Sequence, residues 1–311
     1  MTRKVNILIL FSLLLLSVYI FKPYDSSHSS DEIVNSLKKQ FDPFRENGIR
    51  LEHIESLHKL SEQEKQELGY CRIQIIDGKI YGVNYAAPPH TKSSVGYFNS
   101  LIVAIDRILK TQKINNVDFV YFATDRLNVS SKETLDKIIK SPSFLMSKDM
   151  NSEAEKDRLL LPDAYLLNKK SWATLFKDIT EASKIHPWES KNSKQIFWRG
   201  SSTGGTYNLD NFDKLPRLSL VMLSQSFPQY IDARFTRYNQ FSNDLSGKYL
   251  YNILIRMFEE SSYLNQAEHL KYKYLISIDG NTAAWLRVPW ILLSNSILLK
   301  QETSFIEFFY G

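Results

Sequence analysis

The feature that most limits how this chain can fold is a stretch in which an apolar run ends in a loop of small residues. Its sequence is Ile196-Phe197-Trp198-Arg199-Gly200-Ser201-Ser202-Thr203-Gly204-Gly205-Thr206-Tyr207. The run is typical of a strand, and the glycines let the backbone turn tightly and point N–H groups and hydroxyls at an anion. The stretch therefore predicts a strand leading into an anion-binding loop, with a plain turn and an exposed arginine as the alternative. It has neither the ending of a Walker A loop nor the glycine spacing of dinucleotide-binding folds.

A second stretch has the same design. A strand expected at 274–278 runs into Asp279-Gly280-Asn281, and the next small residues, Thr282, Ala283 and Ala284, are expected to open a helix that carries Arg287 one turn in. A helix N-terminus presents backbone N–H groups to an anion, and the arginine adds positive charge. The stretch therefore predicts a diphosphate site.

Strand and helix patterns alternate along most of the chain. An Asp77-Gly78 turn inside residues 71–83 predicts a hairpin, and the apolar run 117–123 predicts a central strand that ends just before Asp125. Ser130 and Glu133 are expected to form a capping box for the next helix. Further strands are expected at 230–235 and 296–300, and helices at 171–184, 215–223 and 248–258. This alternation predicts an α/β protein with two stacked domains.

Residues 1–30 have the pattern of a targeting segment. Arg3 and Lys4 precede an apolar run over 5–21, and bulky residues occupy the place where a signal peptidase needs small ones. The segment therefore predicts an uncleaved signal-anchor and a short stem. The positive charge at the N-terminus predicts a type II orientation, with the catalytic part across the membrane.

Composition narrows the class of protein further. The 311 residues, 43% of them hydrophobic, are enough for two domains, which we expect over 31–187 and 188–311. The net charge of +5 suits anionic partners, but no basic run predicts nucleic-acid binding. The single cysteine, Cys71, excludes an internal disulfide, and no Asp-x-Asp motif is present to hold a metal against a diphosphate.

Several of these segments together resemble glycosyltransferase family 90, which includes protein O-glucosyl- and O-xylosyltransferases, capsule xylosyltransferases and lipopolysaccharide-modifying enzymes. The similarity runs from about Val117 to the last residue. The segments that carry it are Phe197-Trp198-Arg199-Gly200-Ser201, the helix bearing Arg217, Asp232-Ala233, Lys271-Tyr272-Lys273-Tyr274, Asp279-Gly280-Asn281, Arg287, Lys300 and Phe305-Ile306-Glu307-Phe308-Phe309-Tyr310.

The resemblance implies a GT-B arrangement, in which two Rossmann-like domains face a cleft. The domain over 31–187 would lie on the acceptor side and the domain over 188–311 would bind the donor. The implied reaction is the metal-independent, inverting transfer of a hexose or pentose, glucose or xylose, from a UDP-sugar to a hydroxyl of a protein or glycan acceptor. No resident cofactor is implied.

The resemblance also implies roles for individual residues. Asp125, at the end of its strand, would be the catalytic base, with a solvated loop aspartate or a helix-capping aspartate as the alternative. Arg199 and Arg287, with the backbone amides of 282–284, would neutralise the leaving UDP. Asp279 and Glu307 are candidates for binding sugar or ribose hydroxyls, or for structural caps. The full set expected to bind the donor is Arg199, Gly200, Ser201, Asp279, Asn281, Thr282, Ala283, Ala284, Trp285, Leu286, Arg287 and Glu307.

Two further expectations concern the extent and location of the protein. The sequence stops at Gly311, where members of the family continue, so the donor domain is expected to be incomplete. A non-catalytic, membrane-anchored nucleotide- or sugar-binding protein derived from such an enzyme is therefore the alternative function. An enzyme that uses a UDP-sugar is expected in the ER or Golgi lumen, or facing the cytosol at the inner membrane if the protein is bacterial.

Overall fold

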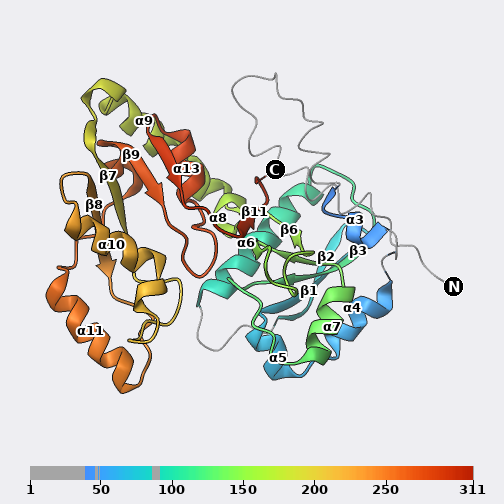
Figure 1. Cartoon of the computed structure of the whole chain (residues 1–311). Helices are drawn as coiled ribbons and strands as arrows, with labels where there is room; N and C mark the ends of the chain where they lie inside the picture. The colour runs from blue at the N-terminus through green and yellow to red at the C-terminus, as the bar shows by residue number, and fades with distance from the viewer. Residues whose placement is uncertain (1–38, 46–47, 49, 86–91, 311) are drawn as a thin grey trace. The chain divides into compact units, whose positions relative to one another are not determined.

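The computed structural model describes residues 39–45, 48, 50–85 and 92–310, and these form two compact units (Figure 1). The first unit extends to Ser171 and also contains the segment that begins at Ser304, whereas the second unit is Trp172–Thr303. The predicted anchor over 1–30 lies outside the described residues. Among the described residues, no helix combines the length and apolar character needed to cross a membrane.

The first unit contains a mixed five-stranded sheet in the order β2-β1-β3-β4-β6. The strands are β1 (Tyr70–Ile76), β2 (Lys79–Tyr85), β3 (Val117–Phe122), β4 (Ser143–Leu145) and β6 (Leu159–Leu160). Strand β1 is antiparallel to both β2 and β3, while β3, β4 and β6 are parallel. The predicted hairpin is confirmed, and its turn residues Asp77 and Gly78 have φ angles of 50° and 75°.

The described part of the first unit also contains several helices. They are α3 (Asp42–Arg45), α4 (Leu51–His58), α5 (Glu62–Glu67), α6 (Lys92–Leu109), α7 (Lys132–Lys140) and α8 (Ala164–Leu167). One core joins α4 and α7 to the sheet and includes Ile54, Leu57, Val120, Phe122 and Ile138. The buried strand β3 therefore ends among apolar side chains, just before Asp125.

The capping box predicted from Ser130 and Glu133 is wrong by one residue. Helix α7 begins after Ser131, whose side chain accepts a hydrogen bond from the backbone N–H of Thr134. The Thr134 hydroxyl in turn donates to Glu64 on α5. This tertiary contact favours Ser131 as the N-cap, and Glu133 pairs with Lys137 on the helix surface.

The last segment of the chain adds a small second sheet to the first unit. Strand β11 (Phe305–Glu307) pairs antiparallel with β5 (Ser147–Asp149), with Phe305 opposite Asp149. The backbone N–H of Met150 also donates to the Ser304 carbonyl at 2.9 Å. Segments more than 150 residues apart in sequence therefore lie side by side.

The second unit is built on a parallel four-stranded sheet in the order β10-β9-β7-β8. Its strands are β7 (Asn192–Ser201), β8 (Ile231–Arg237), β9 (Tyr272–Ser277) and β10 (Ile297–Lys300). The helices are α9 (Lys169–Ile185), α10 (Pro216–Ser226), α11 (Leu245–Met257), α12 (Gln266–His269) and α13 (Arg287–Leu293), with short 3₁₀ turns at Trp188–Ser190 and Phe212–Lys214. The predicted α/β class is confirmed.

Helices cover both faces of this sheet because successive strand residues point to opposite sides. Trp198 on β7 and Phe235 on β8 pack in a core with α10 and α11. Phe197, the residue before Trp198, packs instead in a core with α9 and α13. The apolar run recognised in the sequence is thus a strand that is buried on both faces.

The strand order places a switch point between β7 and β9. From β7 the chain passes through α10 to β8 on one side, whereas from β9 it passes through α13 to β10 on the other side. The loops that leave β7 and β9 therefore separate at the carboxyl ends of two neighbouring strands. Open α/β sheets bind their ligands at such a point.

Candidate anion-binding site

The loops that follow β7 and β9 contact each other closely at this switch point. Gly204 has a φ of +107°, and its backbone N–H donates to the Asn281 side-chain oxygen at 3.2 Å. A Cβ atom added at Gly204 would lie 3.3 Å from the Gly280 carbonyl oxygen. Glycine is therefore required for both the backbone conformation and the close approach of the two loops.

Arg217, in the first turn of α10, joins these two loops through its guanidinium group. Nε donates to the Asp279 carbonyl at 3.0 Å, and Nη1 donates to the Ser201 carbonyl at 3.0 Å and to the Thr203 hydroxyl. Gly280 leaves room for this group, because a Cβ there would lie 2.9 Å from Arg217 Nη2. The guanidinium is thus fixed against the carboxyl ends of both strands.

Arg287, at the start of α13, contributes a second guanidinium to the same region. Its Nη2 donates to the Arg199 carbonyl at 2.9 Å. Both guanidinium carbons lie over the ring of Trp198, at 5.7 Å from its centroid for Arg217 and 5.8 Å for Arg287. Both positive charges therefore lie against the same indole ring.

Trp198 itself has an unsatisfied polar group. The side chain is fully buried, yet its Nε1–H has no hydrogen-bond partner among the described residues. Gly200 makes space for the ring, because a Cβ at that position would lie 2.5 Å from Trp198 Cζ2. A buried donor without a partner costs free energy that a bound acceptor would recover.

Neither of the two guanidinium groups is paired directly with a carboxylate among the described residues, although the Asp279 carboxylate acts on Arg217 at longer range. Within the part of the chain that the structure describes, neither Arg217 nor Arg287 forms an ion pair with an acidic residue. Burial, followed by repulsion from Arg217, lowers the pKa of Arg287 to about 9, and burial lowers the pKa of Arg217 to about 10. Holding both charges in place is therefore costly, and an anion bound between them would reduce that cost.

Arg199, which was also expected to bind the diphosphate, has its guanidinium engaged within the protein. Nη2 pairs with Asp232 at 2.9 Å, Nη1 donates to the carbonyls of Trp198 and Asp232, and Nε donates to the Ser261 hydroxyl at 3.0 Å. These contacts tie β7 to β8. In this structure the Arg199 side chain is a link between strands, and its role in phosphate binding stays a prediction.

The helix expected to open at Thr282 is absent. Residues 281–286 form bends and a turn, and α13 begins at Arg287. Trp285 has a φ of 49°, a left-handed conformation that ends any helical path before Arg287. The Ala284 N–H, which was expected to face a bound anion, donates instead to Asp279 Oδ1 at 3.2 Å.

The Asp279 carboxylate holds this loop in place. Oδ2 accepts from Lys300 Nζ at 2.8 Å, and the Asp279 backbone N–H donates to the Gln301 side chain at 3.0 Å. The residue is 5% exposed, so its carboxylate is used within the loop. Asp279 and Lys300 therefore act as a structural cap here, which is one of the two roles expected for Asp279.

The other predicted donor residues lie in different environments. Gly200 and Ser201 end β7, and the Ser201 carbonyl accepts from Arg217. Thr282 and Ala283 are buried, whereas Asn281, Trp285 and Leu286 are partly buried in the same loop. Glu307 is 1% exposed, and it lies with Asp125 in the first unit. The predicted residues of 199–201 and 279–287 are thus brought together by the second sheet.

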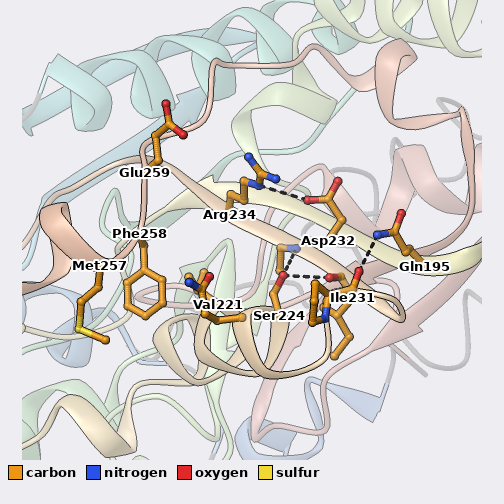
Figure 2. A pocket seen from close by; sticks show the side chains of 12 residues that line it. Gln195, Val221, Ser224, Ile231, Asp232, Arg234, Met257, Phe258 and Glu259 are labelled. Atoms are coloured by element: carbon orange, nitrogen blue, oxygen red, sulfur yellow. Dashed lines mark hydrogen bonds and ion pairs between the residues drawn. The ribbon is translucent and has the colours of Figure 1, made fainter.

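A separate pocket of about 360 Å³ lies beside the first half of β8 (Figure 2). It is lined by Ile231, Asp232, Ala233 and Arg234 together with residues from the ends of α10 and α11. None of the predicted donor residues lines it. Two of its polar side chains are used internally, because Ser224 bonds to the Ile231 and Ala233 backbones and Gln195 donates to the Pro228 carbonyl (Figure 2).

Sequence reasoning placed Arg217 on a helix and in the family pattern but gave it no role at the anion site. Its importance comes from hydrogen bonds to two segments, 201–203 and 278–279, and the second lies more than 60 residues further along the chain than Arg217. An arginine immediately after Pro216, the first residue of α10, was the available signal in the sequence.

Among the described residues, no group of three or more His, Cys, Asp or Glu side chains could hold a metal ion.

The fold defines an α/β protein, with an arginine-rich candidate anion site at the switch point of a parallel sheet. Comparison with known proteins is consistent with this class: the model of Glycosyl transferase family 90 matches residues 25–311. The chain belongs to glycosyl transferase family 90.

Individual relatives match over shorter segments. Protein O-glucosyltransferase 2 of Danio rerio is 32% identical over 124 residues, which cover 40% of this chain and 21% of that protein. Protein O-glucosyltransferase 3 of Mus musculus is 30% identical over 123 residues, which cover 40% and 20%. The matched segment thus spans about a fifth of the length of these relatives.

Proposed function

We propose that this protein transfers a sugar from a UDP-sugar to a hydroxyl group of a protein acceptor. The family assignment and the relatives, which are named protein O-glucosyltransferases, favour glucose as the sugar, with xylose as the second choice. The observation that carries the proposal is the pair Arg217 and Arg287 beside the buried indole of Trp198. Two guanidinium groups without carboxylate partners fit the diphosphate of a nucleotide sugar.

In the proposed reaction the arginines stabilise the leaving group. Negative charge grows on the UDP β-phosphate as its bond to the sugar breaks, and Arg217 and Arg287 are positioned to neutralise it without a metal ion. The Trp198 indole N–H is a further donor for an oxygen of the donor substrate. Guanidinium groups make strong, often bidentate hydrogen bonds to phosphate, so they are suited to this task.

Asp125 is the proposed general base. It takes the proton from the acceptor hydroxyl as that oxygen forms a bond to the anomeric carbon. The bond from this carbon to the UDP oxygen breaks on the opposite face, and the electron pair leaves with UDP. The configuration at the anomeric carbon is therefore inverted.

The same proposal includes the architecture and location of the protein. It comprises the GT-B arrangement, the membrane anchor over 1–30 and a catalytic part in the lumen.

The test is UDP release by the purified full chain with UDP-glucose, UDP-xylose and UDP-galactose, using water and hydroxyl-bearing peptides as acceptors. We expect turnover with UDP-glucose or UDP-xylose. We expect Asp125→Asn to bind UDP with normal affinity but to form UDP from the sugar donor at least about 100-fold more slowly. UDP binding without turnover in the wild-type chain would instead favour the non-catalytic alternative. Absence of UDP binding would contradict the transferase, and absence of both nucleotide and sugar binding would contradict the alternative as well.

A further inference from the structure

Asp125 lies in a bend after β3, and the two residues that follow it are tied to one buried carboxylate. Glu155 is fully buried, and its Oε1 accepts from the Leu127 backbone N–H at 2.8 Å and from Arg126 Nε at 3.2 Å. Its Oε2 accepts from the Asp149 backbone N–H at 2.8 Å. A single side chain therefore joins the Asp125 bend to strand β5.

The Arg126 guanidinium group also binds a second carboxylate, that of Asp149. Nη2 donates to Asp149 Oδ2 at 2.9 Å. Burial raises the pKa of Asp149, but hydrogen bonds from Ser304 and the Asn151 N–H, together with Arg126, outweigh it and lower that pKa. The Asp149 carboxylate is thus held in the charged form that pairs with Arg126.

Strand β11 covers this network from the other side. The Arg126 guanidinium lies over the Phe305 ring, 4.9 Å from its centroid. Phe305 is paired with Asp149 in the β5–β11 ladder, so its ring is placed by backbone hydrogen bonding. The cation therefore lies between two acidic side chains and an aromatic ring that comes from the end of the chain.

These contacts fix the backbone around Asp125 at several points. The Thr124 hydroxyl donates to the Arg126 carbonyl at 3.1 Å, so it bridges Asp125 locally. The Leu127 N–H and the Arg126 side chain are fixed by Glu155 and Asp149. With its neighbours on both sides held, the backbone from which the Asp125 side chain projects is restrained.

We infer that Arg126 is a positioning residue for Asp125, and that Asp149 and Phe305 act through it. Glu155 acts both through Arg126 and directly on the Leu127 backbone. This inference rests on the proposed function, in which Asp125 is the base. A lysine at 126 would supply charge to one carboxylate but could not bridge both, because the bridge needs the planar, forked guanidinium. A displacement of the base by about 1 Å costs roughly 100-fold in rate, so a change at Arg126 should appear mainly in kcat.

The experiment compares Arg126→Lys, Glu155→Gln and Asp125→Asn, together with the Arg126→Lys/Asp125→Asn double variant, in UDP release from the preferred donor. Glu133→Gln is the control, since it breaks a surface ion pair of the same unit. We expect kcat to fall about 10- to 100-fold in Arg126→Lys and Glu155→Gln, with the donor KM changed less than about twofold. If Arg126 acts through Asp125, the double variant should be no slower than Asp125→Asn alone.

Other results would overturn the inference. Wild-type kcat in Arg126→Lys, or a loss in the double variant equal to the product of the two single losses, would show that Arg126 does not act through Asp125. A fall in kcat matched by an equal fall in the folded fraction, measured by circular dichroism, would show loss of folded protein instead of displacement of the base and would also overturn the inference. An Asp125→Asn variant as fast as wild type would refute the proposed function itself, and the inference would fail for that separate reason.

Discussion

Arg287 donates a hydrogen bond from Nη2 to the backbone carbonyl of Arg199 at 2.9 Å. The two arginines expected to bind the diphosphate are therefore in contact. Arg287 uses its guanidinium group in this contact, and Arg199 uses its backbone carbonyl. Arg199 directs its guanidinium to Asp232 and contributes its carbonyl to the site, whereas Arg287 has no carboxylate partner among the described residues. We conclude that Arg199 supports the site and that Arg287 presents the charge.

Arg199→Lys should destabilise the second unit without removing the anion site. A lysine cannot reproduce the contacts to Asp232, Trp198 and Ser261, so we expect the free energy of unfolding to fall by about 2 to 4 kcal/mol. The carbonyl that holds Arg287 is retained, and UDP affinity should change less than about threefold. Denaturant unfolding and calorimetry check this. A large loss of affinity at unchanged stability would show that Arg199 itself binds phosphate.

Arg287→Met should stabilise the ligand-free protein. Burial and Arg217 lower the pKa of Arg287 to about 9, which means that its charged form costs free energy in the folded state at neutral pH. Replacing it with an apolar side chain of similar length removes this cost and loses one hydrogen bond. We expect the free energy of unfolding to rise by about 1 kcal/mol. A fall of similar size would mean that the two charges are not in conflict.

His269 should make the protein less stable in mild acid. It is 5% exposed and donates from Nδ1 to the Asn265 carbonyl, and its ring packs against Phe197 and Trp290. Burial, with repulsion from Arg287 and Arg199, lowers its pKa from 6.5 to about 4. The unfolded chain therefore binds a proton that the folded chain does not, and stability falls as the pH drops from 6.5 to 4.

The expected loss for His269 is at most about 3 kcal/mol over this window. It should be measured as the difference between wild type and His269→Gln at each pH. This comparison is needed because Asp163 acts in the opposite direction: burial raises its pKa to about 6, so its contribution grows as the pH falls from 6 to 3.8. A difference that does not vary with pH would contradict the assignment to His269.

Gly280→Ala should weaken UDP binding by displacing Arg217. The new Cβ would lie 2.9 Å from both Arg217 Nη2 and Thr203 Oγ1, and the guanidinium is fixed by several hydrogen bonds, so it cannot move freely. We expect a loss of about 10-fold in affinity and of about 1 to 3 kcal/mol in stability. Gly96→Ala is the matched control, since a Cβ there meets nothing within 4 Å, and it should raise helix stability slightly.

Much of the fold could be predicted from the sequence because local patterns decide it. The strands ending at Phe122 and Ser201 were visible as apolar runs, and the hairpin was visible from its turn residues. The helix expected at Thr282 failed because the left-handed Trp285 depends on the packing of the loop around Asp279. No local pattern in the sequence indicates that conformation.

The sequence predicted which segments form the candidate site, but it did not predict which arginine has which role there. The stretches after β7 and β9 do meet, as their shared design suggested. Whether an arginine faces a ligand or a carboxylate depends on strand register, and here the parallel pairing of β7 with β8 brings Asp232 to Arg199. The role of Arg217 and the pairing of β11 with β5 depend on contacts between residues far apart in sequence.

The most direct test of the anion site is the affinity for UDP, measured by titration calorimetry on wild type, Arg287→Met and Arg234→Met. Arg234 is an exposed arginine on β8, so its variant removes the same charge outside the site. We predict that Arg287→Met weakens UDP binding by about 10- to 100-fold and that Arg234→Met leaves it unchanged. Equal UDP affinity in wild type and Arg287→Met would contradict the account.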